Sequence, residues 1–206
     1  MKIEINLKII FIILLFFLIN NLSTYIIFLV SILIHELAHL LVGILIGGKL
    51  ERFIVSPFGM SLEFFSYGKD KRSYRILFYV IGPVINFIIA FITKLFFITN
   101  ELTTIIIYTN IAIAFFNLMP IMPLDGGKIT KEFLKCFIEN EKANKFIIHF
   151  SKFYLMIMSF AYGILIIKIK NIMILILILY LWHLYFIEEK KYYIYEKTTN
   201  SIKNII

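Results

Sequence analysis

Apolar runs of about 20 residues recur along the chain and constrain its fold more than any other feature, because a helix of that length crosses a hydrocarbon core of about 30 Å. Hydrophobic residue types make up 61% of the 206 residues, which excludes a water-soluble globule. The sequence therefore predicts an all-α membrane protein with about six transmembrane helices. The candidate spans are residues 7–20, 23–46, 75–97, 102–120, 147–167 and 171–187.

These spans form one predicted polytopic membrane domain, residues 1–190, and residues 191–206 form a short cytoplasmic tail that is no separate domain. The segment 47–74, after the second span, is expected to be a short irregular stretch or a β-hairpin. Irregular backbone at membrane depth is tolerated only where it lines a protein or water-filled cavity. We therefore expect this segment at the cytoplasmic mouth of the protein or in a groove.

The distribution of positive charge predicts the orientation of the chain. The formal net charge is +8, and most Lys and Arg residues lie in the loops 47–74 and 121–146 and in the tail. With both termini in the cytoplasm these segments share the inner side, as the positive-inside rule requires. The prediction is a multi-pass bacterial cell membrane protein whose termini and active site face the cytoplasm. Its basic residues would adjoin anionic lipids, not nucleic acid.

Proline and glycine interrupt two of the predicted spans. In "IGPVINF", Gly82 and Pro83 predict a kinked or broken third span, because proline removes a backbone donor. In "FFNLMPIMPLDGGK" the fourth span is interrupted in the same way. The residues that follow, 128–146, are amphipathic and charged, and they predict a cytoplasmic or interfacial helix.

The stretch "HELAH", residues 35–39, places three ionisable side chains inside an apolar run. On a helix His35 and His39 lie on one face, one above the other, at a separation that one Zn²⁺ can bridge. Glu36 projects about 100° around the axis and suits a general base beside the metal. Random placement would produce this pattern about 0.004 times per chain of this composition. The alternative is a structural cluster of polar groups packed between helices.

A catalytic zinc site needs a third protein ligand and one open position. The chain has two aspartates. Asp70 lies in the charged run "GKDKR" and is interpreted as a solvated loop residue, whereas Asp125, in "PLDGG", follows an apolar span and is the stronger candidate. Its alternative role is that of a turn or N-cap aspartate for a helix beginning near Lys128. The single cysteine, Cys136, excludes an internal disulfide.

Among the asparagines within the predicted spans, two are candidates for a functional role, since a buried amide there needs hydrogen-bond partners. Asn117 could hold a substrate backbone or polarise a scissile carbonyl, and an interhelical hydrogen bond is the alternative. The same two interpretations apply to Asn86. His149 and His183 each lie alone near the end of a span, so we expect interfacial or packing roles for them.

Together the two motifs resemble the site-2 protease family of intramembrane zinc metalloproteases. The resemblance rests on H-E-L-A-H in the second span and N-x-x-P-x-x-P-L-D-G-G after the fourth. It implies that His35, His39 and Asp125 bind one zinc ion per chain, that Glu36 activates water, and that Asn117 assists substrate or transition-state binding. "IGPVINF" is similar to the family's Gly-Pro element.

Within that family the chain most resembles the stage IV sporulation protein FB branch, through "PFGMSLEF" and the small six-span layout. Pro57, Phe58 and Gly59 are therefore expected to contact substrate. The branch cleaves the membrane-associated precursor of a sporulation sigma factor, which implies the outer forespore membrane as a location and a membrane regulator or inhibitor as a partner. Better-known members continue into a CBS domain, which we expect this chain to lack because it stops at Ile206.

Two other functions agree with parts of the sequence. A site-2-type protease could act on another membrane-tethered regulator, such as an anti-sigma factor. A membrane metal-ion transporter would also use intramembrane His, Glu and Asp residues, but it would be expected to distribute them along a pathway.

Overall fold

The computed structural model describes residues 2–5, 22–56, 59–66, 72–169 and 172–203. The chain divides into two compact units, Met1–Asn117 and Leu118–Ile206. The elements of the first are β1 (Lys2–Ile5), α2 (Leu22–Leu45), β2 (Lys49–Ser56), β3 (Gly59–Ser66), α3 (Arg72–Phe96) and α4 (Glu101–Asn117). Those of the second are α5 (Asp125–Leu134), α6 (Asn140–Ile169) and α7 (Ile172–Lys203).

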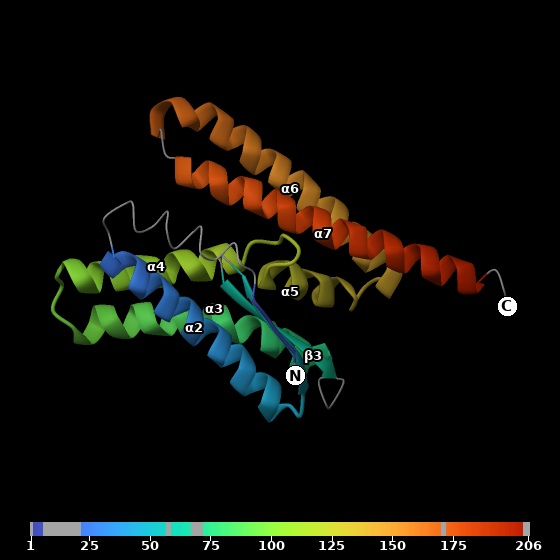
Figure 1. Ribbon diagram of the computed structural model, residues 1–206, viewed down its shortest axis with the longest axis horizontal. Helices are drawn as coiled ribbons and strands as arrows, with labels where there is room; N and C mark the ends of the chain where they lie inside the picture. Colours follow the sequence, from blue (N-terminus) through green and yellow to red (C-terminus); the bar gives the residue numbers. More distant parts are fainter. Residues whose placement is uncertain (1, 6–21, 57–58, 67–71, 170–171, 204–206) are drawn as a thin grey trace. The chain divides into compact units, whose positions relative to one another are not determined.

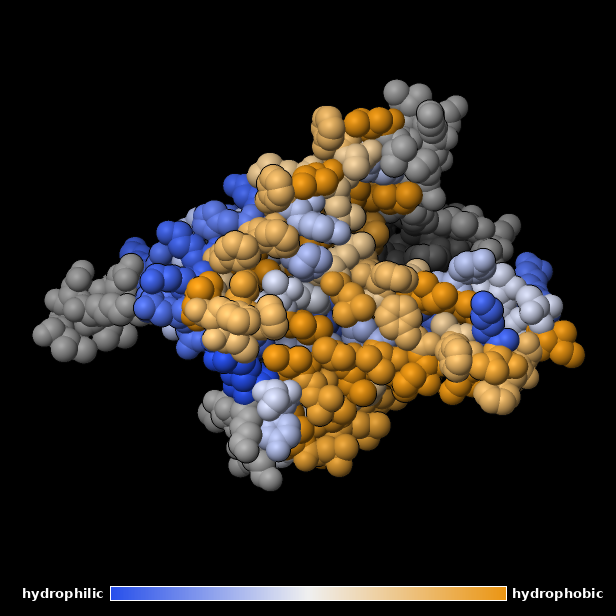
Figure 2. Space-filling model, turned by 180° about the vertical axis from the view of Figure 1, so that it is seen from behind, coloured by the Kyte–Doolittle hydropathy of each residue, from blue (hydrophilic) through white to orange (hydrophobic). Residues whose placement is uncertain are grey.

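Helices α2, α3 and α4 pack against one another and form the core of the first unit (Figure 1). On α2 buried residues recur at helical spacing, at Ser31, His35, His39 and Gly43. The opposite face exposes leucine and isoleucine side chains, and much of the surface in Figure 2 is hydrophobic. An apolar outer face around a polar-containing interior is the pattern of a helix bundle in lipid.

Three described helices are long and apolar enough to cross a bilayer: α2, α3 and the part of α6 from Asn140 to Ile164. They contain the predicted spans 23–46, 75–97 and 147–167 within a few residues at each end. Helix α4 is apolar but only 17 residues long, and α7 contains residues 172–187 of the predicted span 171–187. The first predicted span, 7–20, lies outside the described residues. The count of six spans therefore stays a prediction.

A three-stranded sheet with the order β1-β2-β3 accompanies the helices of the first unit. Strand β1 pairs parallel to β2, and β2 pairs antiparallel to β3. The expectation of an all-α protein with at most one hairpin did not include β1. Its sequence, Lys-Ile-Glu-Ile, alternates polar and apolar residues as a strand does. These four residues precede a long apolar run, and nothing in the sequence indicated which strand they would pair with.

Helix α3 is continuous through Pro83. Of the two predicted outcomes for the third span, the broken helix is therefore wrong, and the kink stays a prediction. Proline removes one helical hydrogen bond, and such a loss is tolerated where neighbouring helices pack around the site. Here α2 and α4 both pack against α3, and Gly82, Pro83 and Asn86 are buried in that packing. The proline therefore lies inside one helix and does not divide it.

The second unit differs from the predictions at one place. A single helix was predicted over 128–146, but α5 ends at Leu134 and α6 begins at Asn140. The chain turns between the two helices through backbone hydrogen bonds that join residues three apart. The N–H of Cys136 donates to the oxygen of Phe133, and the N–H of Phe137 donates to the oxygen of Leu134. The predicted polar tail is helical as far as Lys203. Its side chains form pairs three or four residues apart, such as Lys191 with Glu188, which support a helix outside the apolar region.

Candidate metal centre and active site

Helix α2 presents His35 and His39 on one buried face, as the spacing of four residues predicts. Their side chains are 2% and 4% exposed. The two Nε2 atoms lie 3.1 Å apart, and the rings meet edge to face with centroids 4.8 Å apart. The pair of histidines therefore converges on a single point through the same ring atom.

The other nitrogen of each ring is held by an acceptor on α3. His39 Nδ1 lies 2.6 Å from the backbone oxygen of Phe78, and His35 Nδ1 lies 2.6 Å from Asn86 Oδ1. A carbonyl or amide oxygen can only accept, so each Nδ1 must donate. In the neutral rings the lone pair then resides on Nε2. The 3.1 Å contact is thus between two acceptors, which a shared cation would stabilise.

This arrangement fits a zinc ion. Tetrahedral coordination with Zn–N bonds of about 2.0–2.1 Å places two ligand nitrogens about 3.3–3.4 Å apart, close to the 3.1 Å observed. Metal-binding histidines almost always donate the second ring N–H to a carbonyl, carboxylate or water, which fixes the ring and the tautomer. Phe78 and Asn86 provide such acceptors.

Gly82 gives the two Nε2 atoms the space they occupy. It lies on α3 midway between Phe78 and Asn86, at a spacing of four residues from each. A Cβ atom at position 82 would overlap Nε2 of His39 and of His35. Any side chain there would fill the place toward which both lone pairs point. The glycine of "IGPVINF" is therefore a requirement of the site.

A buried chain of hydrogen bonds continues from Asn86 into α4. Asn86 Nδ2 donates to Asn110 Oδ1 at 2.8 Å, and Asn110 Nδ2 donates to Ser31 Oγ at 3.1 Å. The bond to His35 identifies Asn86 as a residue that orients a histidine. Neither Asn110 nor Ser31 was predicted from the sequence. A second amide within the span 102–120, besides Asn117, was the signal that could have found Asn110.

The remaining predicted residues of the first unit have less enclosed positions. Glu36 is half-buried on α2, on the turn that carries His35. Asn117 is the last residue of α4, is half-buried, and donates from Nδ2 to the backbone oxygen of Ile113 at 3.1 Å. Gly59 is the first residue of β3, while Pro57, Phe58 and Asp70 lie outside the described residues.

In the second unit Asp125 is the first residue of α5 and is buried. The N-cap position belongs to Leu124, so Asp125 lies in the first helical turn, where the helix dipole favours an anion. Lys128 Nζ lies 3.8 Å from Asp125 Oδ1. Farther along α5, burial lowers the pKa of Lys131, and the neighbouring charge of Lys135 lowers it further.

The turn before Asp125 is tightly packed against the start of α5. A Cβ atom on Gly126 would overlap the backbone of Leu118, and one on Gly127 would lie 2.5 Å from the backbone oxygen of Ile121. The backbone N–H of Met122 donates to Ser151 Oγ of α6 at 3.0 Å. Ser151 is fully buried and donates to the backbone oxygen of its own helix at 2.7 Å. Sequence reasoning missed this serine, which looks like any small residue in an apolar span.

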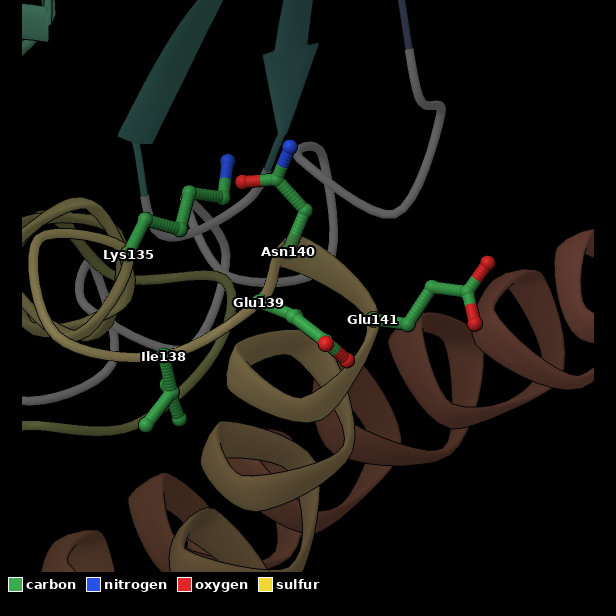
Figure 3. Close-up of a pocket in the computed structure, with 5 residues that line it drawn as sticks. All are labelled: Lys135, Ile138, Glu139, Asn140 and Glu141. Atoms are coloured by element: carbon green, nitrogen blue, oxygen red, sulfur yellow. The ribbon is translucent and has the colours of Figure 1, made fainter.

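The two histidines outside the motif were predicted to have interfacial or packing roles. His149 and His183 are exposed, and among the described residues neither belongs to a group of side chains that could hold a metal. An open hollow of about 550 Å³ lies at the turn between α5 and α6 and is lined by Lys135, Ile138, Glu139, Asn140 and Glu141 (Figure 3). None of the predicted site residues that the structure describes lines it.

Comparison with known proteins assigns the family. Residues 8–124 match the model of the family described as Peptidase M50B-like, and residues 93–158 match that of Peptidase family M50. The chain belongs to peptidase family M50. This confirms the site-2 protease resemblance predicted from the two motifs, and with the three long apolar helices it makes the protein a membrane-embedded one.

Relatives of this M50 protein come from a bacterium and an archaeon. Stage IV sporulation protein FB of Bacillus subtilis (strain 168) is 29% identical over 105 residues, which cover 49% of this chain and 36% of the relative. A zinc metalloprotease of Methanocaldococcus jannaschii is 30% identical over 117 residues, covering 53% of this chain and 34% of the relative. The matched stretches thus span about a third of the length of each relative.

The solved structure of the site-2 protease from Methanocaldococcus jannaschii is similar over most of the chain. The TM-score is 0.67 at 26% identity, and the match covers 91% of this chain and 89% of that one. The similarity extends over both units of this M50 protein.

Replacing Gly82 by alanine is expected to lower the affinity for zinc by at least about tenfold, because the new methyl group enters the space between the two Nε2 atoms. Zinc affinity of the purified protein in detergent, measured by competition with a chelator, tests this. Gly163→Ala is the matched control, since a Cβ there meets no atom within 4 Å. Equal zinc affinity in Gly82→Ala and wild type would contradict the geometry.

Replacing Ser151 by alanine leaves the Met122 N–H buried without its acceptor and is expected to cost about 1–3 kcal/mol of stability. Chemical unfolding in detergent measures the loss. Thr198→Ala serves as the control, because Thr198 is exposed and bonds the oxygen of Tyr195 on its own helix. A Ser151 variant no less stable than the Thr198 variant would show that the turn is held by other contacts.

Proposed function

We propose that the protein is a zinc-dependent intramembrane endopeptidase. The observation that carries the proposal is the pair of buried histidines whose Nδ1 atoms donate to α3 acceptors and whose Nε2 atoms lie 3.1 Å apart. Membership of family M50 supports the same reaction.

In this proposal His35, His39 and Asp125 hold one zinc ion. Each offers one ligand atom, and all three side chains are buried. Two imidazoles and one carboxylate leave a fourth position open, as catalytic zinc sites require. The position of Asp125 in the first turn of α5 and the packed turn before it support its role as a ligand.

Zinc, when bound, lowers the pKa of a water and polarises a carbonyl as a Lewis acid. The residues of the chain supply the rest of the reaction. Glu36 takes the proton of the attacking water and passes it to the leaving amine. Asn86 and the backbone of Phe78 keep both histidines in the required orientation, and Gly82 keeps the space beside them open.

Asn117 is proposed to contact substrate or the transition state. Its place at the end of α4, directly before the "LMPIMPLDGG" segment, supports this role. An amide N–H that polarises a developing oxyanion contributes most when it is fixed in place, and one N–H of Asn117 bonds the oxygen of Ile113.

Substrate is proposed to bind as an extended strand. Peptide bonds within a transmembrane helix are hidden by their own hydrogen bonds, so a substrate must unwind locally before cleavage. Strand β3 ends the strand order of the sheet and contacts α2, the helix of the histidines. An edge strand can receive a peptide by β-augmentation. Gly59 at the start of β3, together with Pro57 and Phe58, is proposed to contact it.

The proposed substrate is the membrane-associated precursor of a sporulation sigma factor, on the basis of 29% identity with stage IV sporulation protein FB. Another membrane-tethered regulator, such as an anti-sigma factor, is the alternative. A cytoplasmic active site, an outer forespore membrane location and a membrane-bound regulator belong to the same proposal. A metal transporter would need ligands distributed in series along a pathway.

Replacing Glu36 by glutamine is expected to lower the cleavage rate by about 10²–10⁴-fold, because the general base is lost while the metal ligands stay. Co-expression with tethered candidate substrates measures cleavage, and metal analysis of the purified variant measures zinc. Zinc content should equal that of the wild type. Cleavage at the wild-type rate in a zinc-loaded Glu36→Gln protein would refute the mechanism.

Replacing Asp125 by alanine is expected to lower zinc affinity by more than about 100-fold, because it removes one of the three proposed ligands. Loss of a residue that only orients a ligand typically lowers metal affinity by about 10–100-fold. The chain's other aspartate provides the control: Asp70→Ala should bind zinc as the wild type does. If both variants bound zinc equally well, the third ligand would have to be a different residue.

A further inference from the structure

We propose that Asn110 is a positioning residue of the metal site, which acts through Asn86 to fix the proton of His35 on Nδ1 and the lone pair on Nε2. The inference rests on the proposed function, in that it takes His35 to be a zinc ligand. Asn110 lies on α4 and does not belong to either sequence motif of the family resemblance.

Two acceptors fix the orientation of the Asn110 amide. Its Nδ2 donates to the backbone oxygen of Ile106 at 2.9 Å and to Ser31 Oγ at 3.1 Å. The oxygen and nitrogen of an amide side chain are distinguished by the hydrogen bonds they make. A backbone oxygen can only accept, so the NH₂ group must face Ile106. The carbonyl oxygen of Asn110 is thereby directed to Asn86.

Asn86 connects the oriented amide of Asn110 to His35. Asn86 Nδ2 donates to Asn110 Oδ1 at 2.8 Å, so the oxygen of the Asn86 amide is the atom that faces His35 Nδ1 at 2.6 Å. His35 must then donate from Nδ1. If the Asn86 amide were reversed, its NH₂ group would face Nδ1 and favour the other tautomer. That tautomer carries a proton on Nε2, which prevents coordination.

His39 shows why the relay is needed for one histidine only. Its Nδ1 donates to the backbone oxygen of Phe78, an acceptor that cannot be reversed. His35 instead faces a side-chain amide, whose two ends differ little in size but have opposite hydrogen-bonding character. Only the network that holds the amide decides which end faces the ring.

Burial makes this network decisive. Asn86 and Asn110 are 0% and 1% exposed, so bulk water cannot replace a lost partner. In such surroundings a satisfied network is rigid and an unpaired polar group is costly. The relay joins α2, α3 and α4 through side chains that would otherwise be unfavourable in an apolar bundle.

The test compares three variants of the full chain in detergent. Asn110→Leu removes the relay, Ser31→Ala removes only the second acceptor of Asn110, and Thr93→Val removes a buried hydroxyl that bonds the backbone oxygen of Ile89. Selective ¹⁵N-histidine labelling of the metal-free protein reports the tautomer of each ring, and a His35→Ala spectrum assigns the signals of His35. Chelator competition gives the zinc affinity.

Asn110→Leu is expected to lose the fixed Nδ1–H tautomer of His35 and to bind zinc about tenfold more weakly, at the low end of the effect of such orienting groups. Ser31→Ala and Thr93→Val should retain both properties, because the oxygen of Ile106 still orients Asn110. If Asn110→Leu does not fold, Asn110→Ala is measured in its place with the same expectation.

A folded Asn110 variant with the wild-type tautomer and zinc affinity would overturn the inference. The His35→Ala variant separates this outcome from a failure of the proposed function. If His35→Ala lost zinc while the Asn110 variant kept it, only the relay would be wrong. If His35→Ala kept wild-type zinc affinity, the proposed zinc site and the relay would both be wrong.

Discussion

The hydrogen bonds from His35 and His39 to acceptors on α3 are the interactions on which the rest of the site depends. Spacing along α2 places the two rings on one face, but spacing alone leaves each ring free to rotate and to exchange tautomers. The Phe78 oxygen and the Asn86 amide remove both freedoms. The packing of α3 against α2 therefore determines what the site can bind, because it directs the Nε2 lone pairs of both histidines to one point.

The second constraint is that neighbouring atoms lie very close to the backbone at certain positions. In both units these positions are occupied by glycine. At Gly82 a methyl group would occupy the space beside both Nε2 atoms, and at Gly126 and Gly127 it would overlap the turn that precedes α5. Gly163 on α6 has no atom near its Cβ position, so a glycine in this chain does not by itself indicate a crowded position. The three crowded glycines all lie beside residues of the motifs, which connects the sequence patterns to packing.

The sequence predicted the parts of the site that depend on local spacing. His35 and His39 share a face because four residues make about one helical turn, and α2 and α3 agree with the predicted spans within a few residues. Partner choice could not be predicted, since Asn86, Asn110 and Ser31 meet only after three helices pack. Strand β1 was missed for a similar reason, because its pairing with β2 is a contact distant in sequence. The roles of Glu36, Asn117 and Asp125 remain proposals.

The chemical nature of the orienting groups suits a site within an apolar bundle. Metal-binding histidines in many proteins donate to a carboxylate, but each additional charge near the middle of a membrane costs about 2.5–3.5 kcal/mol on insertion scales. Here a backbone oxygen and a neutral amide accept the two Nδ1 protons. They fix the rings without adding a charge to the interior. A neutral amide lacks the symmetry of a carboxylate, however, because one of its two ends donates. An asparagine in this position therefore requires a neighbour that determines which end faces the ring, and Asn110, anchored to the oxygen of Ile106, meets that requirement.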